Sequence, residues 1–511
     1  MSDWTQGYVS DIEYLPGFYA EQTPAHLDVV CLLKGMEPPV EAGQTYNYCE
    51  LGCGVGESAL AIAAASPDSR VWGFDFNPAH IARANKLATA SGLGNIVFEE
   101  ASFETLANGS SSHDLPAFDY IALHGVWSWV SIENRAHIVR FIDRHLKPGG
   151  LVYVTYNALP GWASAVPLQR MLYMFGTVGS DRSDRRIVDA LAMVREFADA
   201  GVRALPQELL ESLSKEKNLA YLSHEYLNEH WAPCFHADVA RDLATAKLSY
   251  VGTANILENF PDVSLSKEQR ELLARAPAAI SETLKDYFLE RTFRRDVFVR
   301  GARAIPDRRL DSRIAERSLC LVVPPKAVTR DIRIPLGTAT LNERFYGPAL
   351  EALTGRPHTI GELMRLPGTE KSTATPREVL GMLVGSRQAM LMTGAPAEAG
   401  LAAVRAYNAV HLRACADEGR AVCALAATGV GSALTVRLFE MLAYEVLVAG
   451  CAVDVDAVTT AIWQLLASRD DRIRHEGEII EDEQESLRLL RENVKDILAL
   501  ALPIWQRTGA I

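Results

Sequence analysis

One stretch near the N-terminus, residues 46–58, constrains the fold of this chain more than any other. Its sequence, YNYCELGCGVGES, begins with an aromatic and apolar run typical of a buried strand and leads into the helix-compatible segment 58–65. Between them lie Gly52, Gly54 and Gly56. Glycines allow a tight turn and let a ligand contact bare backbone, while the first amides of the following helix point toward that ligand. The order strand, glycine turn, helix therefore predicts a nucleotide-type site that includes these three glycines.

The spacing of the glycines indicates which ligand this turn binds. A dinucleotide loop of the form G-x-G-x-x-G would place its third glycine at position 57, where this chain has Glu57, whose carboxylate would repel a pyrophosphate. The triphosphate pattern G-x-x-x-x-G-K-[ST] is missing from this stretch. Glu50 instead lies two residues before the first glycine, at the predicted strand end, where it can face the positive end of a small zwitterion. S-adenosylmethionine is such a ligand, and we predict it as the cofactor.

The next two predicted strands support this cofactor. The run Arg70–Asp75 ends in an acid 19 residues after Gly56, the distance that one helix and one strand require. A carboxylate at that strand end accepts hydrogen bonds from both ribose hydroxyls, so we expect Asp75 to bind the ribose. A third strand over residues 95–103 places Ser102 and Phe103 where an adenine would lie, although many such enzymes carry an acid in place of this serine.

The exits of the fourth and fifth predicted strands are unusually aromatic. In open parallel sheets ligands bind beyond the carboxyl ends of the strands, so the residues that follow these strands should line the mouth of the site. A desolvated aromatic pocket suits an amine acceptor because it lowers the pKa of the amine, and aromatic faces attract an ammonium. We expect His124 to contact the cofactor and to serve as a proton acceptor. The aromatic residues expected to form the acceptor pocket are Trp127, Trp129, Tyr156 and Trp162.

Taken together, these motifs carry a family resemblance. The segments ELGCGVG, GFDFNP, LHGVWSWV and LKPGGLVYVTYNALPGW, which begin at residues 50, 73, 123 and 146, resemble those of class I S-adenosylmethionine-dependent methyltransferases. More narrowly, with residues 221–231 and 293–301, the chain is similar to the bacterial family that has a methyltransferase regulatory domain. The best-described members of that family are rickettsial lysine methyltransferases that act on an outer-membrane protein. The resemblance therefore implies a protein substrate.

The pattern of segments and this resemblance predict an α/β fold. We expect a seven-stranded Rossmann-like methyltransferase sheet with a helical insertion and a mostly α C-terminal domain, of which residues 341–395 suit a winged helix. The sixth strand is expected within 249–256 and the antiparallel seventh within 295–301. The predicted divisions are an N-terminal arm (1–45), a cofactor-binding core (46–165), the helical insertion (166–235), a regulatory segment that completes the sheet (236–305) and the C-terminal domain (315–511).

Composition excludes several other classes of protein. A net charge of -13 and a pI near 5.5 argue against a nucleic-acid partner held by bulk electrostatics. The start of the chain lacks the pattern of a signal peptide, and the most apolar stretch, 421–436, falls short of the ~20 residues that a bilayer requires. Eight cysteines without a C-x-x-C pair indicate reduced thiols and a cytoplasmic protein. His224 and His230 are six residues apart, not the four that a zinc-binding helix uses, so we expect no metal.

These observations favour a cytoplasmic methyltransferase that N-methylates lysine side chains of a protein, with a homodimer as the expected assembly. No N/D-P-P-Y motif follows the fourth predicted strand, which counts against amides and nucleobase amines as acceptors. Two alternatives stay open at this point. The acceptor could be a small molecule or a glycan, or the chain could bind S-adenosylmethionine as a regulatory protein without catalysis.

Overall fold

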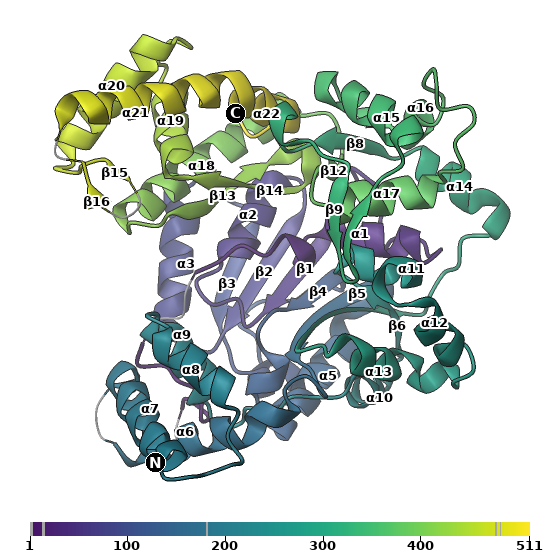
Figure 1. Ribbon diagram of the computed structural model, residues 1–511, viewed down its shortest axis with the longest axis vertical. Coiled ribbons are helices and arrows are strands. Elements are labelled where there is room, and N and C mark those ends of the chain that lie inside the picture. Colours follow the sequence, from purple (N-terminus) through teal and green to yellow (C-terminus); the bar gives the residue numbers. More distant parts are fainter. Residues whose placement is uncertain (1–3, 13–15, 180–181, 476–477, 481) are drawn as a thin grey trace.

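A seven-stranded mixed sheet lies at the centre of the computed structural model, which describes residues 4–12, 16–179, 182–475, 478–480 and 482–511 (Figure 1). The strand order is β3-β2-β1-β4-β5-β7-β6, and only β7 runs against the others. This order confirms the predicted fold class, including the antiparallel strand near the end of the sheet. The strands are β1 (Asn47–Leu51), β2 (Arg70–Asp75), β3 (Ile96–Glu100), β4 (Phe118–Leu123), β5 (Leu146–Asn157), β6 (Leu248–Thr253) and β7 (Phe293–Arg300).

Helices cover both faces of this sheet, which is why its central strands are apolar on both sides. All six residues of β4 are buried. One hydrophobic cluster joins the sheet to the helices of the first face, and a second joins it to those of the other face. The first face carries α1 (Pro24–Leu33), α2 (Glu57–Ala65) and α3 (Pro78–Ala90), and the second carries α4 (Phe103–Ala107), α5 (Ile132–His145) and α10 (His236–Ala244).

Local capping determines where α3 and α4 begin. Asn77 caps α3, because its side chain accepts a hydrogen bond from the Ala79 amide and Pro78 occupies the first helical position. The third strand is shorter than predicted. It ends at Glu100 because Ser102 caps α4, where its Oγ accepts a hydrogen bond from the Thr105 amide at 3.1 Å. Ser102 and Phe103 therefore belong to a helix start rather than to the strand.

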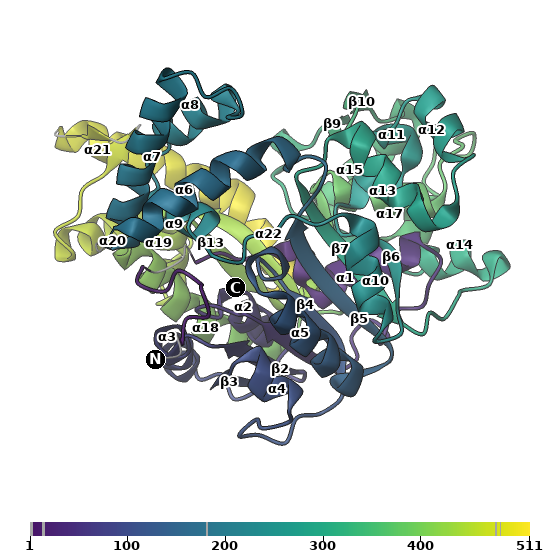
Figure 2. The same ribbon diagram turned by 90° about the horizontal axis from the view of Figure 1, so that it is seen from below.

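The segment after β5 is helical, as predicted, and it closes over the carboxyl edge of the sheet (Figure 2). Its apolar cluster also includes Val9 and Ile12 of the N-terminal arm, so the arm and the insertion pack together. The insertion consists of α6 (Val166–Val178), α7 (Ser183–Asp199), α8 (Gln207–Lys215) and α9 (Leu219–Tyr226). Between β6 and β7 the chain forms α11 (Pro261–Ser264), α12 (Lys267–Leu273) and α13 (Ala278–Leu289).

The first part of the C-terminal region has the helices and the small sheet expected of a winged helix. The sheet order is β11-β8-β12, and a separate hairpin pairs β9 with β10. The segment 302–335, which follows β7, contains structure of its own. The elements are α14 (Asp307–Ala315), β8 (Ser318–Leu321), β9 (Asp331–Ile334), β10 (Gly337–Thr340), α15 (Glu343–Gly355), β11 (His358–Thr359), α16 (Ile360–Leu363), α17 (Pro376–Gly385) and β12 (Ala389–Leu391).

The remainder of the chain is mostly helical and folds around one hairpin. This hairpin, β13 (Val422–Ala427) with β14 (Ser432–Arg437), accounts for the apolar stretch 421–436. None of the described helices is long and apolar enough to cross a bilayer. The other elements are α18 (Glu398–Asp417), α19 (Leu438–Val448), α20 (Val455–Ser468), β15 (Arg474–His475), β16 (Glu478–Ile479), α21 (Glu483–Asp496), a π-helical turn (Ile497–Ala501) and α22 (Leu502–Thr508).

The C-terminal region packs directly on α2, the helix that follows the glycine turn. Glu57, the first residue of α2, is 4% exposed and lies between an arginine and a histidine of this region. Arg420 donates to both of its oxygens at 2.8 and 3.0 Å, and His411 Nε2 lies 3.4 Å from Oε1. Arg420 also donates to the Pro16 carbonyl at 3.4 Å. The division at residue 315 stays a prediction, but one hydrophobic cluster runs from Leu27 to Ala433 across it.

Two of the cysteines depart from the prediction. Cys415 and Cys423 form a disulfide at the turn between α18 and β13, so the expectation of eight reduced thiols is wrong for this pair. The sequence carries no local signal for it, because the two cysteines are eight residues apart and meet only when the hairpin packs beside α18. Among the other six, five are buried, as expected for packed cysteines, and Cys451 is half-buried.

Replacing Arg420 by alanine should lower the free energy of unfolding by about 3 kcal/mol, since it leaves the buried Glu57 carboxylate without its nearest cation. Denaturant unfolding of the full chain measures this change. The matched control is Arg488→Ala, which removes a 58% exposed arginine paired with Glu485 and Glu492 on a helix surface. The control should unfold like the parent protein. Equal stability losses in the two variants would contradict an anchoring role for Arg420.

Candidate functional site

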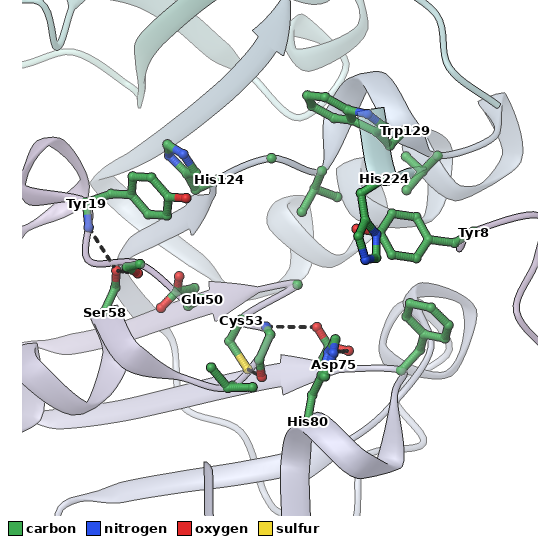
Figure 3. Close-up of a pocket in the computed structure, with 18 of the residues that line it drawn as sticks. Tyr8, Tyr19, Glu50, Cys53, Ser58, Asp75, His80, His124, Trp129 and His224 are labelled. Carbon is green, nitrogen blue, oxygen red and sulfur yellow. Dashed lines mark hydrogen bonds and ion pairs between the residues drawn. The ribbon is translucent and has the colours of Figure 1, made fainter. Parts of the chain in front are cut away.

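A cavity of about 580 Å³ opens at the carboxyl edge of the sheet, where sequence analysis places the ligand (Figure 3). The ends of four strands contribute to it through Glu50, Asp75, His124 and Asn157. The N-terminal arm covers one side and α9 of the insertion covers another. The arm contributes Thr5, Gln6, Tyr8, Pro16, Gly17 and Tyr19, and α9 contributes Tyr221, His224 and Glu225.

The three glycines of the turn have different roles. All have positive φ, at +71° for Gly52, +55° for Gly54 and +77° for Gly56. A Cβ on Gly54 would meet no atom within 4 Å, so this glycine presents bare backbone to the cavity. A Cβ on Gly52 would lie 2.5 Å from the Val126 side chain, and one on Gly56 2.5 Å from the Phe98 ring. Gly52 and Gly54 line the cavity, whereas Gly56 lies behind it and allows α2 to pack closely against the sheet.

Asp75 connects the glycine turn to the end of β2. One of its carboxylate oxygens accepts a hydrogen bond from the Gly54 amide at 2.9 Å, and the other accepts from the Asn77 amide at 2.9 Å. His80 Nδ1 lies 3.3 Å from that second oxygen. A carboxylate has about four acceptor positions, so capacity remains for a ligand hydroxyl. We propose Asp75 as the ribose ligand that its place in the sequence predicts.

Glu50 is buried at the end of β1, on the other side of the turn. Gln22 Nε2 donates to its Oε1 at 2.9 Å, and its Oε2 has no hydrogen-bond partner among the described residues. Burial raises the pKa of this carboxyl to about 7, although the Gln22 amide offsets part of the effect. A buried carboxylate oxygen without a partner is costly, so the site is suited to a ligand with a cationic or N–H group. This is the environment predicted for the amino end of the cofactor.

The region expected to hold an adenine is lined by Ala101, Ser102, Phe103 and Phe76. Ser102 is engaged as the cap of α4, so its Oγ already accepts one hydrogen bond. Phe76, which directly follows Asp75, was missed by the sequence reasoning. The rings of Trp4 and Tyr8 each lie 5.9 Å from the Phe76 ring, so the arm extends this aromatic surface. The position one residue after the strand-end acid is the signal that could have identified it.

His124 lies in the cavity, as predicted, but it is a weak base. Its ring stacks on Tyr19 with centroids 3.5 Å apart, and its Nδ1 lies 3.2 Å from the Tyr153 hydroxyl. Burial and, to a smaller extent, the nearby cation of Arg295 lower the pKa of His124 to about 3. The imidazole is therefore neutral across physiological pH. It can form hydrogen bonds with a ligand, but its protonation near neutral pH is unfavourable, which weakens the expected role as proton acceptor.

The aromatic residues expected at the acceptor end fall into two groups. Trp129 and Trp162 line the cavity. Trp127 and Tyr156 are fully buried in the hydrophobic cluster on the α5 and α10 side of the sheet. The Tyr156 hydroxyl donates to Asp296 Oδ2 at 2.5 Å and lies 3.3 Å from His236, which explains its orientation. The structure thus does not place Trp127 or Tyr156 at the cavity, and we no longer assign them a role in acceptor binding.

Several polar residues of the cavity were not singled out from the sequence as acceptor ligands. The side chain of Asn157, at the end of β5, donates from Nδ2 to Glu225 Oε1 at 3.0 Å. The backbone amide of Asn157 donates to Ser128 Oγ at 2.8 Å. His224 Nε2 lies 3.0 Å from the Ile12 carbonyl, which ties the arm to α9. Burial lowers the pKa of His224 to about 4, so this side chain is also neutral. The adjacent His224 and Glu225 within YLSHEYL are the sequence signal that could have identified this part of the cavity, but from the sequence that segment is tested only for metal binding.

Comparisons with known proteins agree with this geometry. Residues 43–192 match a family model described as "Methyltransferase domain", and residues 218–300 match one described as "Predicted methyltransferase regulatory domain". An uncharacterized protein of Synechocystis sp. is 34% identical over 99% of each chain. An uncharacterized protein of Rickettsia prowazekii is 26% identical over 64% of this chain and 58% of its own length. The structure of PKMT2 from Rickettsia typhi in complex with AdoHcy matches with a TM-score of 0.68 at 18% identity, over 97% of this chain and 99% of that one.

The chain belongs to the bacterial methyltransferase family that carries this regulatory domain. Its regulatory domain is part of the catalytic unit, because residues 218–300 include α9 at the cavity and the strands β6 and β7 of the central sheet. The cofactor of this methyltransferase is S-adenosylmethionine. The cavity fits it, since Gly54 leaves backbone bare, Glu50 has a buried oxygen without a partner and Asp75 lies at the strand end.

Replacing Asp75 by alanine should weaken binding of S-adenosylmethionine at least 100-fold, because two charge-assisted hydrogen bonds to the ribose contribute about 1.5 to 3 kcal/mol each. The change also releases the Gly54 amide. Titration calorimetry with the cofactor measures the affinity. Asp68→Ala, at an exposed acid in the turn before β2, is the matched control and should bind normally. Parent-like affinity of the Asp75 variant would contradict the proposed ribose site.

Proposed function

We propose that this methyltransferase N-methylates lysine side chains of a protein substrate. The observation that carries the proposal is the aromatic wall of the cavity beyond the strand ends, formed by Trp129, Trp162, Tyr221 and Phe293. Aromatic faces attract an ammonium group and exclude water from it. The charged groups that line the cavity are Glu50, Glu57, Asp75, Glu225 and Arg295, so carboxylates predominate. Such a cavity suits a cationic acceptor better than an acidic one.

The chain's own residues would position the acceptor and remove it from water. S-adenosylmethionine supplies a methyl group that its sulfonium already activates, so the protein mainly has to orient the nucleophile. An acceptor ammonium must lose a proton before its nitrogen can attack. Desolvation by the aromatic wall lowers the pKa of the amine and promotes this loss. The arm and α9 close the cavity from two sides, which excludes water from the reacting groups.

Two further observations support a lysine acceptor. The sequence motifs resemble those of rickettsial lysine methyltransferases, and the whole chain shares its fold with PKMT2 from Rickettsia typhi. The aromatic segment LHGVWSWV contributes Trp129 to the cavity wall, and the segment that ends at Trp162 contributes the second tryptophan. These parts of the resemblance therefore lie at the site itself. The possible homodimer stays a prediction from sequence.

Mass spectrometry of proteins incubated with the enzyme and S-adenosylmethionine tests this function. We expect mass increments of one or more methyl groups on lysine side chains, and no increment without the enzyme. Peptide fragmentation assigns each increment to a residue. Methyl groups found only on carboxylates, hydroxyls or non-protein acceptors would rule out the lysine acceptor.

Replacing Trp162 by alanine should lower methyl transfer at least ten-fold while the affinity for S-adenosylmethionine changes less than two-fold. The Trp162 ring lines the cavity and packs edge-on against Trp231, with ring centroids 5.5 Å apart. Its ring partners among the described residues are Trp231 and Tyr226, neither of which belongs to the glycine turn. Steady-state rates and calorimetry separate the two effects. A loss of cofactor affinity as large as the loss of methyl transfer would show that Trp162 binds the cofactor and not the acceptor.

A further inference from the structure

Glu225 is a buried carboxylate that the cofactor site does not use. It lies on α9, within the regulatory domain, and its side chain is 9% exposed and lines the cavity. Asn157 at the end of β5 donates from Nδ2 to Glu225 Oε1 at 3.0 Å. The backbone of Asn157 is held by the hydrogen bond from its backbone amide to Ser128 Oγ. The Glu225 carboxylate therefore belongs to a helix of the insertion, but a residue of the central sheet fixes its orientation.

Among the described residues, no lysine or arginine forms an ion pair with the Glu225 carboxylate. Burial raises the pKa of Glu225, and the hydrogen bond from Asn157 and the nearby Trp231 indole offset part of that effect. The other carboxylates of the cavity differ in this respect. Glu57 is paired with Arg420, and Asp75 receives the Gly54 and Asn77 amides. Arg295, the cation of the cavity, acts on His124 and Tyr19.

The aromatic residues that support a lysine acceptor lie on the same elements as Glu225 and its partner. Tyr221 precedes Glu225 by one turn of α9, and the two groups interact electrostatically. Trp162 follows Asn157 by five residues, and its ring packs against Trp231, whose indole lies near Glu225. A carboxylate has about four acceptor positions, and the Asn157 side chain occupies one of them. The remaining positions suit a group with several N–H donors.

We propose that Glu225, oriented by Asn157, is the subsite that binds the acceptor ammonium and receives its proton. This inference rests on the proposed lysine acceptor and adds the residue that recognises it. In the proton transfer, one N–H bond of the ammonium breaks, an O–H bond forms on the Glu225 carboxylate, and the electron pair stays on nitrogen for the attack on the methyl group. His124, neutral and weakly basic, is left to hydrogen-bond within the cofactor half of the cavity.

The first test measures binding rather than turnover. The probe is n-butylammonium, which reproduces the end of a lysine side chain, and n-butanol is its neutral counterpart. Saturation-transfer NMR on the full chain with S-adenosylhomocysteine should give at least ten-fold weaker binding of n-butylammonium to Glu225→Gln than to the parent. Binding of n-butanol should be unchanged. Glu211→Gln, at an exposed glutamate of α8, is the matched control and should bind both probes normally.

The second test measures transfer to a lysine-containing protein acceptor. Glu225→Gln should lower kcat/KM at least 100-fold with cofactor affinity unchanged, and Glu225→Asp, which keeps the charge, should recover part of that loss. If Glu225→Gln fails to fold, Asn157→Ser replaces it as the test variant. Asn157→Ser removes the hydrogen bond that orients Glu225 and should raise KM for the acceptor. Parent-like ammonium binding and turnover in Glu225→Gln would overturn this inference while leaving lysine methylation standing. A parent enzyme that methylates only acceptors other than lysine would instead overturn the proposed function.

Discussion

The hydrogen bonds that Asp75 accepts from the Gly54 and Asn77 amides are the contacts on which the rest of the site depends. They join the end of β2 to the glycine turn and to the start of α3. The glycine turn, whose Gly54 lies 21 residues before Asp75, therefore meets the end of β2 and the start of α3 at one carboxylate. Because Gly54 is held there with its backbone bare, the cavity has a fixed floor for a ligand. The strand order then brings the exits of β4 and β5 beside this floor.

The opposite side of the same turn is fixed by the C-terminal region. Glu57 argued against a dinucleotide cofactor, and the structure gives this residue a different use, as the anchor for Arg420 and His411. Arg420 also contacts the carbonyl of Pro16, which belongs to the arm that covers the cavity. The C-terminal region thus contacts both the helix that begins at the cofactor site and the segment that closes it. Its role at the site is to support these two elements.

The strands and the cofactor end of the site were predictable because their signals are local. Each strand is a short apolar run, and Glu50, Gly54 and Asp75 lie at fixed offsets from strand ends. The acceptor end was predicted only in part. Tyr156 and Asn157 are neighbours on β5, and successive strand residues point to opposite faces, so only Asn157 reaches the cavity. Sequence spacing cannot decide this when a strand is buried on both sides.

Contacts between distant segments could also not be predicted from the sequence. Glu225 reaches Asn157 across 68 residues, and Arg420 reaches Glu57 across 363. Neither pair has a pattern that spacing could reveal, because helical packing decides which side chains meet. The result is a cavity with two polar ends, one at Asp75 and Glu50 and one at Asn157 and Glu225. The segment that matches the regulatory-domain model contributes Glu225 to one of these ends and two strands to the sheet, so it belongs to the same structural unit as the cofactor site.

Transfer of a tritiated methyl group from labelled S-adenosylmethionine into a bacterial lysate tests whether this protein methylates lysine side chains. The lysate is separated after the reaction into protein, nucleic-acid and small-molecule fractions, and the protein fraction is hydrolysed to amino acids. We expect label in the protein fraction, recovered after hydrolysis as methylated lysine. Label confined to nucleic acid or small molecules, or binding of the cofactor without any transfer, would contradict this expectation.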